Sequence, residues 1–272
     1  MSAGQAIRIA KPQGNQPPAI VRQAAKPEQF VRIEQFNARL VAEQSPKSVQ
    51  VERGGPAVLA VIERGDGTAA WRFPTIDPPS TSDYADASRG HASIRVVKGK
   101  METNVGNLLD GRGQSTADSP GESAVFADKE RGGRILLDLG QTVSVRKINT
   151  YSWHDFHPRN IDYHLRAPQH YDLFGYAGPA PPATDKDLRA AGWVLIARVN
   201  TDEFFKVPPV QNRPAQQAVS LTAARGPLGA YRYLLWDIKS TTRAGKRGDI
   251  NTFYGEFDVY AEPGETQRTR GE

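Results

Sequence analysis

The chain of 272 residues contains no cysteine, which excludes disulfide bonds, thiolate metal ligands and cysteine nucleophiles. It also lacks any apolar run near the roughly 18 residues that a membrane-spanning helix requires. Its first residues, Met1 to Gln5, do not have the charged and then apolar pattern of a signal region. The nucleophile elbow, the P-loop and the dinucleotide-binding glycine pattern are missing as well, so the sequence predicts no enzyme of these classes.

Turn-forming residues are plentiful, with 25 glycines and 20 prolines. This composition favours many short strands over long helices. A hydrophobic content of 38% and a charged content of 24% are typical of a globular protein. The net charge is +5, but Lys and Arg are scattered among Asp and Glu. That distribution is typical of a solvated surface, and nucleic acid is not expected as a partner.

The most regular stretch of the sequence runs from Arg134 to Trp153. Its alternation predicts one strand over Ile135 to Leu139, a corner at Gly140-Gln141, and a second strand over Val143 to Tyr151. The alternation slips near Lys147, where a β-bulge would absorb the extra residue.

Other segments of alternating or apolar sequence predict further short strands. They cover residues 57–63, 68–73, 93–97, 171–176, 193–199, 218–221, 231–238 and 253–260. Many short strands with little amphipathic helix indicate an all-β sandwich. Residues 1–27, rich in Pro and Gln, predict an extended arm or linker. Residues 28–90 predict a small β region of unknown fold, residues 91–262 the main domain, and residues 263–272 a polar tail.

The second predicted strand runs into a loop in which aromatic, imidazole, carboxylate and guanidinium groups are crowded. Rigid strands that carry a polar and aromatic loop are typical of a binding site. The candidate binding residues are Trp153, His154, Asp155, His157, Arg159 and Arg166. Trp153 can equally be a core residue at a strand end, and the two histidines can serve in loop packing and capping.

The two histidines also allow an enzyme hypothesis. His154 and His157 would ligate a transition metal if the loop turned back on itself. On a straight strand, residues three apart point to opposite faces, and a third ligand such as His164 or His170 would be needed. A carboxylate pair for glycoside hydrolysis cannot be recognised among 30 acidic residues without geometry. We therefore predict a binding protein and not an enzyme.

The densest basic cluster is Lys-Ser-Thr-Thr-Arg-Ala-Gly-Lys-Arg, from Lys239 to Arg247. It is predicted to lie in the loop before the last strand. A polyanion such as a sulfated glycan or a nucleic acid would suit it, and a solvated loop would explain it equally well.

Several segments, taken in order, resemble one known family. They are residues 109–111 (Leu-Asp-Gly), 135–140, 145–151, 158–159 (Pro-Arg), 171–175, the strand at Trp193, 231–234 and 254–260. Over about residues 93–262 this set resembles the discoidin family, also called the coagulation-factor type C domain. That family is a galactose-binding-like jelly roll shared with many carbohydrate-binding modules.

The resemblance implies an all-β galactose-binding-like jelly-roll sandwich, preceded by the small β region and the arm. It implies a non-catalytic module that recognises a carbohydrate or other cell-surface ligand through loops at one end, in an extracellular or periplasmic setting. In sugar-binding members this loop often holds the binding residues, which here are His154, His157 and Arg159. The alternatives are a structural or assembly domain whose arm reaches a protein partner, and an accessory domain of a hydrolase.

The resemblance also implies one structural calcium ion, held by backbone carbonyls, the Asp of the Asp-Gly turn and a Glu near the last strand. These positions are Asp110 and Glu256. Calcium accepts six to eight oxygen ligands in irregular geometry, so a loop and a distant strand can share it. The sequence departs from the family pattern at Arg112, where Asn or Asp is more usual, and this cation would repel a metal unless it points outward. Without calcium, Asp110 would cap a turn and Glu256 would form a salt bridge at a sheet edge.

Overall fold

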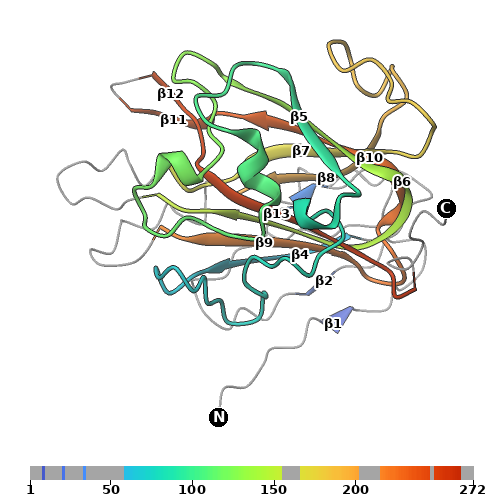
Figure 1. Ribbon diagram of the computed structural model, residues 1–272, viewed down its shortest axis with the longest axis horizontal. Helices are drawn as coiled ribbons and strands as arrows, with labels where there is room; N and C mark the ends of the chain where they lie inside the picture. Colours follow the sequence, from blue (N-terminus) through green and yellow to red (C-terminus); the bar gives the residue numbers. More distant parts are fainter. Residues whose placement is uncertain are drawn as a thin grey trace.

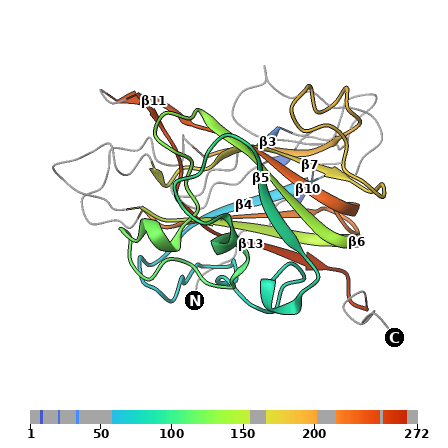
Figure 2. The ribbon, with the colours of Figure 1, turned by 45° about the horizontal axis from the view of Figure 1, so that its top comes forward.

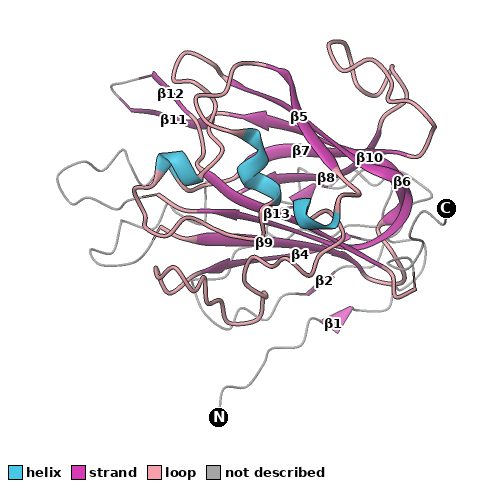
Figure 3. Ribbon diagram, in the orientation of Figure 1, coloured by secondary structure: helices cyan, strands magenta, loops and turns pink. Residues whose placement is uncertain are grey.

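The computed structural model of the chain describes residues 58–154, 166–201, 215–245 and 248–264, together with the backbone of three two-residue strands near the N-terminus (Figure 1). Strands joined by loops make up most of this part, with a few short 3₁₀ helices (Figure 3). The predicted all-β fold is therefore confirmed. None of the helices in these residues has the length and hydropathy that crossing a membrane requires.

The strands follow the predicted pattern closely. Their bounds are β1 (Arg8–Ile9), β2 (Ile20–Val21), β3 (Ile33–Glu34), β4 (Val58–Arg64), β5 (Ser93–Lys98), β6 (Gly132–Ser152), β7 (His170–Tyr176), β8 (Val194–Asn200), β9 (Gln217–Ala223), β10 (Gly229–Lys239), β11 (Thr241–Gly245), β12 (Gly248–Ile250) and β13 (Tyr254–Ala261). The 3₁₀ helices are η1 (Ala87–Arg89), η2 (Val105–Leu109) and η3 (Pro120–Glu122). The β1–β2 and β11–β12 pairs form two small separate sheets.

Strand β6 belongs to both layers of the sandwich. Its first part, residues 132–138, pairs with β5 and β10, and its last part, residues 147–152, pairs with β9 and β13. The strand bends at Gly140, whose φ of 79° lies in the left-handed region that favours glycine. The predicted corner at Gly140-Gln141 is thus correct, but one continuous bent strand replaces the two separate strands that we expected.

The predicted bulge is also present in β6. Tyr260 of β13 pairs with Lys147 and Ala261 pairs with Val145, so Arg146 between them has no opposite residue. One extra residue in one strand is the definition of a bulge, and it returns the alternation to phase.

Two layers result from this pairing. One contains β5, the first part of β6, β10, β7 and β8, with β3 at the edge; the other contains β13, the last part of β6, β9 and β4 (Figures 1 and 2). Strand β4 lies in the predicted N-terminal β region, and it pairs with β9 along its whole length. This part of the region therefore extends the second layer.

The strand predicted over residues 68–73 is wrong, because these residues form turns and irregular backbone. The carboxylate of Asp66 accepts hydrogen bonds from the backbone N–H and the hydroxyl of Thr68, and the N–H of Trp71 donates to the carbonyl of Thr68. Local side-chain bonds of this kind compete with strand pairing.

The core lies between the two layers. The apolar side chains that fill it come from both layers and include Leu137 and Val145 on β6, Leu234 and Trp236 on β10, and Phe257 on β13. Burying a large apolar side chain contributes roughly 1.5–3 kcal/mol relative to leaving it in water. The two layers are therefore held together mainly by apolar contact.

The outer face of the second layer is covered by residues 65–86, which we call the strap. Its Trp71 is 1% exposed and meets Tyr151 of β6 and Trp153, just after β6, edge-on, with ring centroids 6.0 and 5.5 Å away. The indole N–H donates to the carbonyl of Gln114, 3.0 Å away. Trp71 has a φ of 48°, which is costly for a bulky side chain and persists only where packing enforces it.

Candidate functional site

The two predicted calcium ligands lie together in the structure. Asp110 follows η2, and Glu256 lies on β13. Glu256 is fully buried, and neither of its carboxylate oxygens has a hydrogen-bond donor within the described residues. Its carboxyl group lies near that of Asp110, whose charge contributes to raising the pKa of Glu256. Two carboxylates accept and do not donate, so they can approach in this way only with a proton or a cation between them.

Three further carboxyl groups, those of Asp83, Asp86 and Asp258, surround this pair. Each has one buried oxygen that lacks a hydrogen-bond partner in the described residues. Burial, with the charges of Asp258, Asp110 and Asp83, holds the pKa of Glu256 well above its usual range. Burial likewise raises the pKa of Asp258 to about 8 and that of Asp83 to about 6. The cluster therefore favours any bound positive charge.

Carboxylate oxygens, which this pair offers, are among the ligands that calcium accepts. Within the described segments, no three His, Asp or Glu side chains are arranged to hold a metal, so backbone carbonyls would have to complete a shell begun by Asp110 and Glu256. Calcium tolerates such a shell. Asp110 also caps its turn, accepting the N–H of Arg112 at 2.9 Å, while the Arg112 side chain is exposed. Glu256 is buried and has no cationic partner among the described residues, so the alternative of an edge salt bridge is not seen there.

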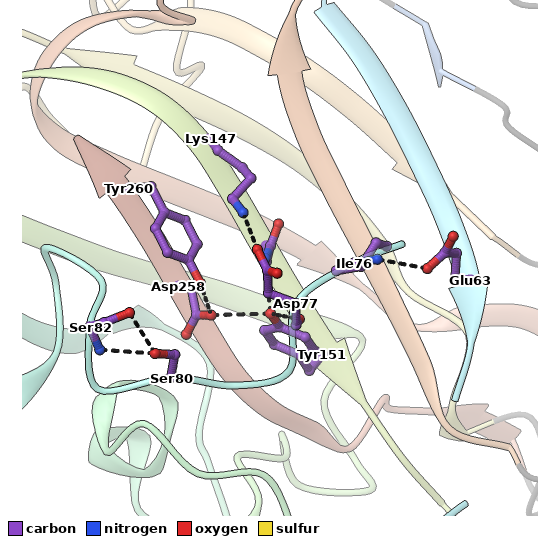
Figure 4. Close-up of polar contacts among 10 residues, drawn as sticks. Glu63, Ile76, Asp77, Ser80, Ser82, Lys147, Tyr151, Asp258 and Tyr260 are labelled. Carbon is purple, nitrogen blue, oxygen red and sulfur yellow. Dashed lines mark hydrogen bonds and ion pairs between the residues drawn. The ribbon is translucent and has the colours of Figure 1, made fainter. Parts of the chain in front are cut away.

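Beside the cluster, a polar network joins the strap to the sheet (Figure 4). The Oδ2 atom of Asp258 accepts hydrogen bonds from the hydroxyls of Tyr260, at 2.8 Å, and Tyr151, at 3.1 Å. The Tyr151 hydroxyl also lies 2.7 Å from the carbonyl of Asp77, and the Asp77 carboxylate pairs with Lys147 at 2.8 Å. These bonds fix the middle of the strap over β6 and β13.

The second candidate site is the loop end, which we define as the end of the sandwich where β6 and β10 finish and β7 and β13 begin. Of the predicted ligand-binding residues, Asp155, His157 and Arg159 lie outside the described residues. Trp153 is 4% exposed and packs against Trp71, so it is a core residue and offers no ring face to a ligand. An aromatic residue at a strand end has the same sequence pattern whether it faces the core or the solvent.

His154 and Arg166 both lie at the loop end. His154 is buried, with its ring 4.4 Å from that of Phe253 and tilted edge-on to it. The guanidinium of Arg166 lies 5.2 Å from the centre of the same phenyl ring. One Nη of Arg166 donates to the Asp128 carboxylate at 3.0 Å. The Arg166 side chain is 19% exposed and that of Asp128 is 64% exposed, so the ion pair forms part of the rim.

Residues 251–253 tie the loops of this end together. The Asn251 amide donates to the carbonyls of Phe126, Ala127 and Glu130, at 3.1, 2.9 and 3.1 Å. The N–H of Phe253 donates to the carbonyl of Arg166, and its carbonyl accepts the N–H of Trp153.

Sequence reasoning missed Asp128, Asn251 and Phe253 as members of the loop end. They come from segments far from the predicted loop, and only strand pairing brings them beside it. No local pattern in the sequence marks them.

No protein-family model matches the chain, and no curated protein matches it. Similar solved structures include the family 32 carbohydrate-binding module of Clostridium perfringens NanJ in complex with galactose (10% identity, 63% of this chain and 94% of that one, TM-score 0.38). Others are the family 32 module of Streptococcus pneumoniae EndoD (13% identity, 66% of this chain and 100% of that one, TM-score 0.39) and Saccharomyces cerevisiae allantoicase (16% identity, 66% of this chain and 43% of that one, TM-score 0.41).

Proposed function

We propose that this chain is a carbohydrate-binding module whose ligand binds at the loop end. The observation that carries the proposal is the ion pair of Arg166 and Asp128 on the rim, supported by the ring of Phe253. Its two charged groups are planar, partly exposed and held in place by neighbouring loops. His157 and Arg159 of the adjoining segment remain predicted ligands.

The chemistry of a sugar matches this pair. Each hydroxyl both donates and accepts, so two neighbouring hydroxyls can donate to the Asp128 carboxylate and accept from the Arg166 guanidinium. Hydrogen bonds to charged groups contribute roughly 1.5–3 kcal/mol each, about twice the contribution of neutral ones. The guanidinium is already ordered by Asp128 and Phe253, which lowers the entropy cost of fixing it on a ligand.

Replacing Arg166 with alanine is expected to weaken glycan binding by roughly 10- to 150-fold, because one charged donor is lost. Asp128→Asn should weaken it less, since an amide oxygen still accepts one bond. Affinity electrophoresis against a panel of polysaccharides, followed by calorimetry on those that bind, measures both effects. Arg225→Ala is the matched control, because this exposed arginine lies between β9 and β10 at the opposite end of the sandwich. Unchanged binding by Arg166→Ala and Asp128→Asn would remove the rim pair from the proposed site.

The second part of the proposal is a calcium ion between Asp110 and Glu256. Its support is the fully buried Glu256 carboxylate without a donor, facing a second carboxyl group. A bound cation would neutralise the repulsion between these two carboxylates and join the loop after η2 to the last strand. Its role would be structural, since it joins two segments far apart in the sequence.

Adding calcium to chelator-treated protein is expected to raise the melting temperature. A ligand at one hundred times its Kd stabilises the folded state by about 2.7 kcal/mol. In a domain of this size that corresponds to a shift of roughly 5–10 °C. Differential scanning calorimetry checks it, with Glu256→Gln expected to abolish the shift and the exposed Glu102→Gln expected to keep it. A shift that survives in Glu256→Gln would place the ion elsewhere.

A further inference from the structure

Exposed cations gather beside the loop end on three neighbouring segments. The N–H of Ala127 donates to the carbonyl of Lys100 at 2.9 Å, Lys98 pairs with Arg134, and Lys239 pairs with Gly132. The end of β5, the segment before β6 and the end of β10 therefore run side by side (Figure 1). We call their basic residues the cationic ribbon: Lys98, Lys100, Lys129, Arg131 and Lys239.

Acidic side chains neutralise the ribbon only in part. Glu102, Asp128 and Glu130 lie on the same segments, and Lys239 pairs with Asp172 at 2.9 Å. Asp128 is already paired with Arg166. Within the described part of the chain, none of the three lysines at positions 98, 100 and 129 forms an ion pair. The sequence that follows, residues 240–247, adds three basic residues and no acidic one.

The ribbon is continuous with the proposed glycan site. Asp128 and Lys129 are adjacent in the chain, and the Asn251 amide holds the carbonyls on both sides of them, at Ala127 and Glu130. A ligand that contacts Arg166 and Asp128 therefore has exposed ammonium groups directly beside it.

An exposed aromatic platform, by contrast, is absent from the described residues. Val194 is the only large hydrophobic side chain exposed there, and Trp153 and Phe253 are buried. Neutral glycans often rely on stacking against such a ring, and single-stranded nucleic acids stack their bases on one. The groups that the described surface offers at this end are charged and hydrogen-bonding.

We infer that the ligand of this module is an acidic glycan, one that bears carboxylate or sulfate groups, bound across the rim pair and the cationic ribbon. The inference rests on the proposed carbohydrate-binding function and names the class of glycan. Hydroxyls of the sugar bind Arg166 and Asp128, and its anionic groups lie against Lys98, Lys100 and Lys129. Exposed charges interact weakly one at a time and are screened by salt, so binding depends on several anions along the chain.

The test compares three polymers at 20 and 300 mM salt by calorimetry. The acidic glycan is polygalacturonate, its neutral counterpart is the same polymer after reduction of the carboxyl groups, and the third is a single-stranded oligonucleotide. We expect polygalacturonate to bind at least tenfold more tightly than the reduced polymer at low salt, and to lose that advantage at high salt. Dextran sulfate measured against dextran repeats the comparison for sulfate groups.

The double variant Lys100→Glu/Lys129→Glu is expected to lower affinity for the acidic polymer at least tenfold and to leave binding of the reduced polymer unchanged. Arg146→Glu/Arg225→Glu is the matched control. It changes the net charge equally, but at the opposite end of the sandwich, where the N–H of Leu228 bonds the carbonyl of Val145. Equal loss of affinity in both variants would show that the overall net charge determines binding of the acidic polymer. It would overturn the assignment of this binding to the cationic ribbon.

The remaining outcomes distinguish a wrong class of glycan from a wrong function. Equal affinity for the acidic and reduced polymers overturns the acidic class and leaves the carbohydrate-binding function in place. Binding of none of the glycans overturns both. An oligonucleotide that binds more tightly than either acidic polymer, with loss in the ribbon variant, assigns the ribbon to nucleic acid and overturns the inference.

Discussion

Replacing Trp71 with alanine is expected to destabilise the protein by about 3–5 kcal/mol, the range for removing a large buried aromatic side chain. Trp71 is almost fully buried and fills the space between the strap and the second layer, against Tyr151 and Trp153. Its indole N–H also satisfies the carbonyl of Gln114, which would be left buried without that partner. Unfolding in urea, followed by circular dichroism, measures the loss.

Trp193→Ala is the matched control for this change. Trp193 is equally buried and its indole N–H also bonds a carbonyl, that of Ala183, but it lies on the outer face of the other layer. Both variants should lose stability. Only Trp71→Ala should also reduce the rise in melting temperature on adding calcium, because Trp71 holds the loop that follows Asp110. A loss below about 1 kcal/mol for Trp71→Ala would contradict its place in the packing.

The second large effect is a dependence of stability on pH in calcium-free protein. Burial raises the folded-state pKa of Asp258 to about 8 and that of Asp83 to about 6, both above the ordinary value of 3.8. The folded state therefore holds protons that the unfolded state releases. This contribution is fully present below pH 4 and is lost as pH rises, up to about 6 for Asp83 and about 8 for Asp258. Each group changes the free energy of unfolding by roughly 1.4 kcal/mol per pH unit within its window.

Asp258→Asn isolates the larger part of this effect, because asparagine mimics the neutral carboxyl group and cannot ionise. Its amide oxygen can still accept a hydrogen bond from Tyr151 or Tyr260. Urea unfolding with chelator present, at pH 5, 7 and 8, should show a flatter dependence in the variant. At pH 8 the variant should be more stable than the original protein by several kcal/mol, since the original loses roughly 1.4 kcal/mol per pH unit across this window. The exposed Asp118→Asn should keep the original slope, and an identical slope in Asp258→Asn would contradict the prediction.

The positions of most strands could be predicted because a strand between core and solvent requires an alternation of apolar residues that is visible over a few neighbouring positions. Alternation of apolar residues located β5, β7, β8, β10 and β13 to within two residues, and the slip near Lys147 located the bulge. Failures occurred where a side chain competed with the backbone, as Asp66 does after β4. The course of β6 was predicted only in part. Gly140 indicated the bend, but no pattern in the neighbouring residues shows that one strand continues through the bend.

The candidate sites were less predictable than the strands. The resemblance paired Asp110 with Glu256, while Asp83, Asp86 and Asp258 were not expected beside them. Side-chain alternation tells which face of a strand a residue occupies, and it says nothing about which distant segment covers that face. The strap that covers β13 supplies two of these carboxyl groups, Asp83 and Asp86, and it carries no regular pattern.

The sequence alone was enough to predict an all-β sandwich and its main corner and to exclude cysteine chemistry. Each of these conclusions follows from composition or from the pattern of neighbouring residues. The burial of Trp153, the meeting of five carboxyl groups and the junction of the rim pair with the cationic ribbon depended on folding. Each joins segments widely separated along the chain, and such contacts are set by strand pairing and core packing between the layers.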